Sequence, residues 1–362
     1  MGILGGIMTC YHPLLRYETY KRYKCLDGHM AYEAKVISIP KDYPYPEQYD
    51  DFEVIAALPD GHYRKRELIP CGKCIGCRLE NSKNKATQAC YEAEEWKHNW
   101  FLTITYDDEH LPEADAAINE ETGEELPRNP GGTLKPADLT NFMKKLRSYY
   151  ERKYNHKRIR FMACGEYGSN TGRAHYHTIC FNLPILPNNM SFWKYNENHE
   201  ALWRCTELEK IWGKGMIVAG DVNWSTCAYV GRYITKKVGM PADKQHYKNL
   251  GIEPEFYRAS NRPGIGKTYY EKHKDEIYKK DSMIVKKYGG GTMKVKPPKY
   301  YDKLYDIENP KKMEEIKKQR KKKSENINKI KYAQTTLYKK EQLNTEEETK
   351  QNKATALIRT KI

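Results

Sequence analysis

The fold depends on one stretch, Arg173-Ala174-His175-Tyr176-His177-Thr178-Ile179-Cys180-Phe181. Its residues alternate as in a β-strand, whose successive side chains point to opposite faces of a sheet. His175 and His177 are therefore predicted on one face, near enough for their imidazoles to share one metal ion. A His-x-His pair in a strand is more often an ordinary surface or core feature, so other parts of the chain must support a metal site.

The segments around this strand show a regular alternation of strand and helix. A helix is expected to begin at Pro136, because apolar residues recur there at helical spacing. These residues are Leu139, Phe142, Met143, Leu146 and Tyr150. The remaining expected elements are a helix over 78–97, strands Trp100–Tyr106, Ile159–Cys164 and Gly215–Val222, and helices over 198–212 and Ser225–Val238.

From Trp100 onward, the order strand, helix, strand, strand, helix, strand predicts an α+β fold of the ferredoxin-like type. This is an antiparallel sheet with helices largely on one face. The first and third strands lie centrally in that topology, so the histidine strand is expected to be a rigid central platform.

The composition favours a soluble protein with a polyanionic partner. The chain has 362 residues, 31% of them charged, and a formal net charge of +15. Such an excess of positive charge indicates nucleic acid, with an acidic membrane surface as the competing partner. No run of eighteen apolar residues is present to span a bilayer. The opening residues also lack the pattern of a signal peptide, so a non-secreted protein without membrane contact is expected.

The cysteines predict a structural zinc site near the N-terminus. Cys71, Cys74 and Cys77 follow one another at Cys-x-x-Cys spacing, which lets thiolates approach one tetrahedral zinc ion. Either Cys10 or Cys90 could supply the fourth ligand. The usual iron–sulfur run is absent. Four other cysteines are spread through the expected elements and are interpreted as small buried side chains, namely Cys164, Cys180, Cys205 and Cys227. Disulfides are not expected, because a chain without an export signal folds in a reducing setting.

The expected helix Ser225–Val238 carries two tyrosines and two lysines that suit phosphodiester chemistry. Tyr229 and Tyr233 are four residues apart and share one helix face, and Lys236 and Lys237 follow on or next to it. A phenol is a competent nucleophile but is mostly protonated at neutral pH, so it needs a cation nearby. Without the paired histidines, a simple tyrosine packing pair with solvent-exposed lysines would be the better interpretation.

Together these motifs resemble the HUH endonucleases, and most closely the replication initiation proteins of gokushovirus-type microviruses. The resemblance covers most of residues 8–270. It is carried by Phe101–Tyr106, Gly165-Glu166-Tyr167-Gly168, His175-Tyr176-His177, Tyr229–Lys237, Pro70–Cys74 and Arg262–Gly266. It implies a rolling-circle replication initiator that nicks and rejoins single-stranded DNA through a covalent 5′-phosphotyrosine.

The resemblance also implies roles for individual residues. His175, His177 and Glu166 would hold Mg²⁺ or Mn²⁺, although the same donors could take Zn²⁺. Tyr229 and Tyr233 would act as alternating nucleophiles assisted by Lys236 and Lys237. Tyr233 with Lys236 also matches the one-tyrosine pattern, which makes it the surer pair.

The implied partners are a single-stranded DNA origin and the host DNA polymerase and helicase, in the bacterial cytoplasm. No Walker-type phosphate-binding motif is present, so no helicase activity is expected in this chain. The competing interpretations are an HUH transposase or relaxase, a non-catalytic zinc-containing nucleic-acid-binding module, and a zinc-stapled structural or packaging protein. Metal-dependent cleavage of single-stranded DNA separates the enzymes from the other two.

Three regions are expected along the chain. Residues 1–95 form an irregular, zinc-stapled N-terminal segment, residues 96–245 the nuclease core, and residues 246–362 a basic, partly disordered C-terminal extension. Basic residues dominate the stretch Lys311–Tyr332. Such a run is a solvated helix or a disordered tail, and it would add non-specific affinity for DNA.

Overall fold

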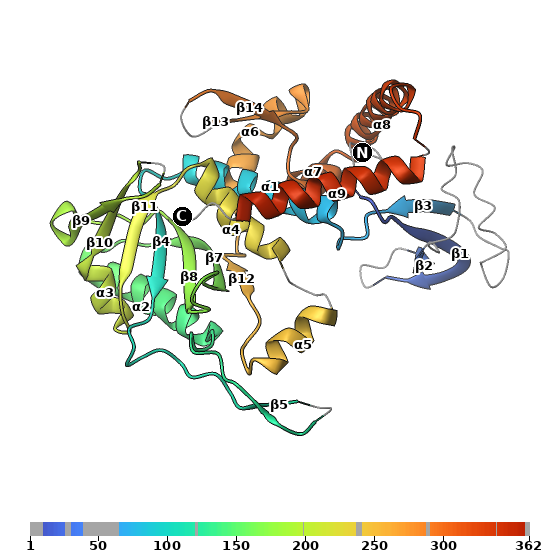
Figure 1. The fold of residues 1–362 in the computed structure, drawn as a ribbon. Coiled ribbons are helices and arrows are strands. Elements are labelled where there is room, and N and C mark those ends of the chain that lie inside the picture. The colour runs from blue at the N-terminus through green and yellow to red at the C-terminus, as the bar shows by residue number, and fades with distance from the viewer. Residues whose placement is uncertain are drawn as a thin grey trace. The chain divides into compact units, whose positions relative to one another are not determined.

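The computed structural model describes residues 10–25, 30–38, 65–119, 122–197, 199–236, 241–286, 290–337 and 339–358. The chain forms two compact units. One comprises Met1–Glu80 with Asn309–Lys361, and the other comprises Asn81–Glu308 with the terminal Ile362. Figure 1 shows the elements of both units. None of the described helices is both long and apolar enough to cross a membrane.

The Asn81–Glu308 unit is built on an antiparallel sheet of seven strands in the order β12-β7-β8-β4-β11-β10-β9. The strands are β4 (Asn99–Thr105), β7 (Arg160–Tyr167), β8 (Ala174–Phe181), β9 (Met190–Tyr195), β10 (Ala201–Cys205), β11 (Ile217–Asp221) and β12 (Phe256–Ala259). Four of them occur in the order β11-β4-β8-β7, which places the first and third core strands centrally. The α+β class and the central histidine strand β8 are therefore confirmed.

One face of this sheet is covered by α2 (Pro136–Tyr154) and α3 (Thr206–Trp212). The apolar stripe predicted for α2 is buried as expected. Its members are Leu139, Phe142, Met143, Leu146 and Tyr150. They pack with Leu102 and Tyr176 of the sheet and Trp212 of α3 in one core.

The opposite face is covered as well, by α1 (Ile75–Glu94) and α4 (Trp224–Lys236). Ala86 and Ala89 of α1 and Val230 of α4 pack there against Phe101 and Ile179. We expected helices largely on one face. The structure differs because β8 is buried on both faces along almost its whole length, so a one-sided cover would leave apolar surface in water.

Two other expectations are corrected. The helix expected over 198–212 begins only at Thr206, because Ala201–Cys205 pairs with β9 as an antiparallel hairpin. The N-terminal segment contains a three-stranded sheet of β1 (Leu14–Lys24), β2 (Met30–Ser38) and β3 (Lys65–Ile69) and is thus not wholly irregular.

The remaining elements complete each unit. The sheet unit also contains the short strands β5 (Ala117–Ile118) and β6 (Glu125–Leu126), α5 (Pro241–Asn249), α6 (Lys267–Lys280), β13 (Met283–Lys286), β14 (Thr292–Val295) and α7 (Lys299–Glu308). The other unit contains α8 (Pro310–Ala333) and α9 (Lys339–Ile358). The basic run Lys311–Tyr332 is therefore helical.

Candidate metal centre and nucleophile

The candidate site lies on the α1/α4 face of the sheet, where three strands bring four side chains together. His175 of β8 pairs with Thr105 of β4 and with Glu166 of β7. His177 pairs with Thr103 on the β4 side. Directly paired residues of neighbouring strands share a face. The register therefore places both imidazoles and the Glu166 carboxylate on one face.

The two histidines predicted as metal ligands both approach one carboxylate oxygen of the third predicted ligand, Glu166. Glu166 Oε1 lies 2.8 Å from His175 Nε2 and 2.8 Å from His177 Nε2. His175 Nδ1 donates a hydrogen bond to the backbone carbonyl of Arg173 at 2.9 Å, and His177 Nδ1 lies 3.1 Å from the Thr103 hydroxyl. These second contacts fix both rings with Nε2 directed at Glu166.

Electrostatics keep the Glu166 carboxylate ionised. Burial alone raises the pKa of the Glu166 carboxyl, but the charge of His177 and hydrogen bonds from both histidines outweigh burial and lower this pKa to about 2. Burial favours the neutral form of His175, whereas its hydrogen bond to Glu166 favours the charged form, and the pKa of His175 is raised. The carboxylate is therefore anionic at neutral pH.

The donor set fits a divalent cation. One atom from each of Glu166, His175 and His177 lies within 4.8 Å of the others. The second carboxylate oxygen, Glu166 Oε2, is buried without a hydrogen-bond partner in the described part of the chain. A buried oxygen that lacks a donor is costly unless a cation or water satisfies it. Imidazole and carboxylate ligands suit Mn²⁺, Mg²⁺ or Zn²⁺.

The phenol of Tyr229 reaches this cluster from α4. Its hydroxyl donates a hydrogen bond to Glu166 Oε1 at 2.7 Å and lies 3.3 Å from His177 Nε2. Its ring packs edge-on against His177, with ring centroids 4.9 Å apart. Burial and the charge of Glu166 raise the pKa of Tyr229 well above its usual value. The phenol is thus protonated at neutral pH.

Sequence reasoning missed two residues of this site, one beside the phenol and one beside His177. The guanidinium of Arg232 lies 5.8 Å from the centre of the Tyr229 ring, and burial lowers the pKa of Arg232. Thr103 holds His177 from the neighbouring strand. The helical i+3 spacing from Tyr229 to Arg232 is the only signal in the sequence for the first residue. Nothing local indicates Thr103, because its role depends on strand register.

The other predicted residues of this helix are placed only in part. Tyr233 and Lys236 lie within α4, one turn and nearly two turns after Tyr229. The side chains of both, and the whole of Lys237, lie outside the described residues.

The four predicted cysteines form a second candidate metal site, in the other unit. The Cys71 and Cys77 sulfurs are 4.0 Å apart, as are those of Cys74 and Cys10. In a tetrahedral zinc site with Zn–S bonds of about 2.3 Å, two sulfur ligands lie roughly 3.8 Å apart. Gly72 has a φ of 75°, which allows the tight turn between the first two ligands.

Backbone amides support this cysteine cluster. Cys71 Sγ accepts hydrogen bonds from the N–H groups of Lys73 and Cys74, at 3.4 and 3.3 Å. A hydrogen bond with Cys10 lowers the pKa of the Cys71 thiol. Of the two alternatives for the fourth position, Cys10 joins the cluster. Cys90 is instead part of α1 and packs against the core that α1 and α4 form with the sheet.

Comparison with known proteins identifies the family of this chain. A family model for the replication-associated protein ORF2/G2P matches residues 99–238, which include both histidines and Tyr229. The chain is 33% identical over 261 residues to the replication-associated protein ORF2 of Spiroplasma virus 4, covering 72% of this chain and 74% of that protein. It is 30% identical over 247 residues to the replication-associated protein VP4 of Bdellovibrio phage phiMH2K, covering 67% and 69%.

A more distant relative is the replication-associated protein ORF4 of Chlamydia phage 1, 27% identical over 59% of this chain and 50% of that protein. No solved structure matches the chain. The matches define the class as phage replication proteins. Within that class the chain belongs to the replication-associated ORF2/G2P family, and the predicted likeness to gokushovirus-type initiators is confirmed.

Proposed function

We propose that this protein starts rolling-circle replication of a phage genome by nicking and later rejoining single-stranded DNA at the origin. One observation carries the proposal: the Tyr229 hydroxyl lies 2.7 Å from Glu166 Oε1 and 3.3 Å from His177 Nε2. A phenol beside a histidine–carboxylate cluster has the two components that metal-assisted transfer to a nucleophile requires.

Glu166, His175 and His177 are the residues that would hold Mg²⁺ or Mn²⁺, and their donor set also admits Zn²⁺. When bound, the cation polarises the scissile phosphate and favours the phenolate form of the nucleophile. The protein fixes the imidazoles through Thr103 and the Arg173 carbonyl. The packed rings of Phe101 and His177 hold the phenol of Tyr229 against the cluster.

The chemistry is a transesterification that conserves the phosphodiester. The phenolic oxygen of Tyr229 forms a bond to phosphorus while the bond from phosphorus to the 3′-oxygen breaks. The proton released by the phenol balances the proton taken up by the 3′-oxygen. The products are a 5′-phosphotyrosine and a free 3′-hydroxyl that primes a host polymerase, and rejoining needs no nucleotide cofactor.

The second tyrosine completes the cycle. Tyr233 follows Tyr229 by one turn of α4. It cuts the regenerated origin after one round, and the freed 3′-hydroxyl then attacks the first phosphotyrosine to release a circle. Lys236 and Lys237 stabilise the charge that develops during these steps. A host helicase opens the duplex in the bacterial cytoplasm.

The test compares Tyr229→Phe, Tyr233→Phe and the double variant for covalent adducts on a labelled origin oligonucleotide. The double variant is expected to form none, and EDTA is expected to abolish adducts of the unsubstituted protein until Mn²⁺ is added in excess. Tyr257→Phe is the matched control, since Tyr257 packs in the same core and is not proposed as a nucleophile. Full adduct formation by the double variant would remove both phenols from the chemistry.

A further inference from the structure

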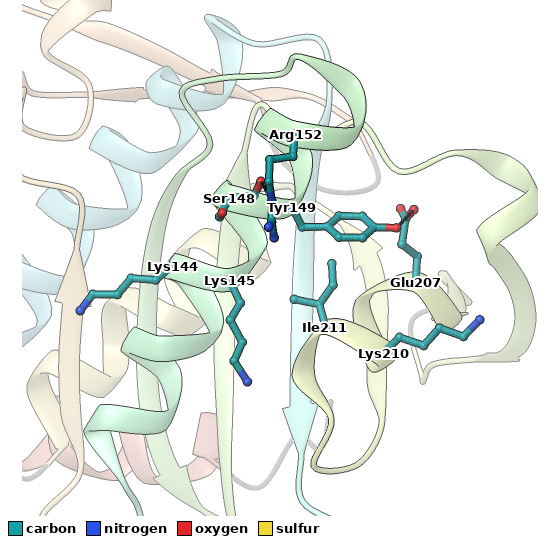
Figure 2. Close-up of a pocket in the computed structure, with 8 residues that line it drawn as sticks. All are labelled: Lys144, Lys145, Ser148, Tyr149, Arg152, Glu207, Lys210 and Ile211. Atoms are coloured by element: carbon teal, nitrogen blue, oxygen red, sulfur yellow. Dashed lines mark hydrogen bonds between the residues drawn. The ribbon is translucent and has the colours of Figure 1, made fainter.

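A groove lined by basic side chains runs between α2 and α3. Figure 2 shows its lining residues, which are Lys144, Lys145, Ser148, Tyr149, Arg152, Glu207, Lys210 and Ile211. Lys144, Ser148 and Arg152 are spaced four residues apart along α2 and so share one face of the helix. Lys210 joins them from α3. We call this surface the basic groove.

The cations of the basic groove are available to an external anion. Lys144, Lys145, Arg152 and Lys210 are exposed. Among the ion pairs of the described residues, none involves any of these four. Within the described part of the chain, Arg152 donates only to the backbone carbonyl of Ser148, at 3.2 Å. Elsewhere on the same unit, exposed lysines do find carboxylates, as Lys280 does with Glu276 at 2.8 Å.

The one carboxylate in the lining is already satisfied. Glu207 is 6% exposed and accepts hydrogen bonds from three phenols of α2. The donors are Tyr149 at 3.0 Å, Tyr150 at 3.1 Å and Tyr154 at 2.6 Å. Lys153 Nζ adds an ion pair at 2.9 Å. Because Lys153 pairs with the Glu207 charge and the phenols satisfy its oxygens, the groove presents positive charge with little opposing negative charge.

The basic groove lies on the opposite side of the sheet from the candidate catalytic site. α2 and α3 cover the face onto which Tyr176 points, whereas His175 and His177 point to the other face. Phosphates bound in the groove therefore belong to a different stretch of DNA from the one being cut. Along α2, from Lys144 to Arg152, the cations extend about 12 Å. That length matches roughly three phosphates of one duplex strand.

From these observations we propose that the basic groove is a second, sequence-independent DNA site that binds the phosphate backbone flanking the origin. This inference rests on the proposed nuclease function. In it, the basic groove holds the DNA substrate on the protein. It predicts that removing the four cations weakens binding of long DNA and leaves cleavage of a short origin oligonucleotide unchanged.

The experiment uses the full chain with Lys144→Gln, Lys145→Gln, Arg152→Gln and Lys210→Gln combined. Fluorescence anisotropy measures the affinity for duplex DNA flanking a single-stranded origin across a series of salt concentrations. The slope of log K against log salt is expected to become shallower by up to about 3 to 4, since each phosphate contact contributes about 0.9. Adduct formation on a short oligonucleotide at saturating concentration is expected to stay at the unsubstituted rate.

Two controls test whether the position of the charges matters, as opposed to the net charge of the protein. A variant with Lys144→Arg, Lys145→Arg, Arg152→Lys and Lys210→Arg keeps all four charges and is expected to retain the full slope. The matched control removes four exposed lysines from other elements of the same unit, namely Lys279, Lys294, Lys299 and Lys303. An equal loss of slope in this control would overturn the assignment of the groove, because net charge alone would then explain the effect.

An unchanged slope in the groove variant would also overturn the inference. If that variant instead lost affinity for polyglutamate, an acidic protein partner would replace DNA. Failure of the unsubstituted protein to form adducts on the short oligonucleotide would refute the proposed function. The anisotropy titration measures DNA binding by the groove independently of adduct formation, so the two proposals can fail separately.

Discussion

The Thr103 hydroxyl lies 3.1 Å from His177 Nδ1 across two neighbouring strands, although 74 positions separate the two residues in the sequence. The contact leaves Nε2 of the same ring directed at Glu166 Oε1, 2.8 Å away. A hydroxyl that orients a metal-binding imidazole fixes the ring and its tautomer.

Thr103→Val is therefore expected to weaken binding of Mn²⁺ about tenfold or more, since loss of such outer contacts costs 10–100-fold in metal affinity. Isothermal titration calorimetry measures the effect. Thr178→Val is the matched control, because the Thr178 hydroxyl is buried on the next strand without a hydrogen-bond partner in the described residues. Equal affinity in Thr103→Val and the unsubstituted protein would contradict the orienting role.

A buried ion pair fixes α1 to the sheet, and the same carboxylate holds the loop Arg262–Gly266. Arg160 Nε donates to Glu92 Oε1 at 2.6 Å, and Glu92 Oε2 accepts from the backbone N–H of Gly266 at 2.7 Å. Arg160→Met leaves the Glu92 charge buried and unpaired. We expect a loss of about 3–5 kcal/mol in the free energy of unfolding, measured by urea denaturation.

The control for this prediction is an exposed pair. Lys280→Met breaks the pair with Glu276 at the surface and is expected to leave the denaturation midpoint unchanged. A midpoint in Arg160→Met that equals the unsubstituted value would show that the buried pair contributes nothing to stability.

The Glu207 cluster predicts a pH-dependent stability. Burial raises the pKa of Glu207, but hydrogen bonds from three phenols and Lys153 outweigh it and lower this pKa below its ordinary value of 4.5. The stabilisation is therefore complete above pH 4.5 and is lost as the pH falls through the lowered pKa. Glu207→Gln is expected to cost about 1–3 kcal/mol at pH 7. The difference in stability between this variant and the unsubstituted protein should become smaller in acid. Thermal melts from pH 7 to pH 3 measure this difference.

The cysteine cluster predicts one bound zinc ion per chain. Cys74→Ser removes one of four sulfurs and is expected to abolish stoichiometric zinc and lower the thermal midpoint. Atomic emission analysis of the purified protein measures the zinc content. Cys25→Ser is the control, because Cys25 lies outside the cluster. This variant is expected to keep its full zinc content. Full zinc content in Cys74→Ser would refute a four-cysteine site.

Local patterns in the sequence predict the elements of the core and the faces of their residues. Alternation in Arg173–Phe181 predicts that His175 and His177 point the same way, and the structure confirms it. Helical spacing predicts the buried stripe from Leu139 to Tyr150. Both predictions succeed because periodicity is a property of the backbone over a few residues.

The hairpin of β9 and β10 could not be predicted in the same way. Residues 201–205 have a composition that suits a helix or a strand, and only pairing with β9 decides between them. The three-stranded sheet near the N-terminus likewise depends on pairing between distant segments, Leu14–Lys24 with Lys65–Ile69.

By itself, the sequence determined the central strand, the shared face of its histidines and the helical face that carries Tyr229. Tertiary structure decided that Cys10 rather than Cys90 joins the cysteine cluster, that Thr103 holds His177, and that the Tyr229 hydroxyl reaches Glu166. The division has a physical reason. Side-chain direction follows from local backbone geometry, whereas these contacts depend on strand register and on the packing of α4 over the sheet.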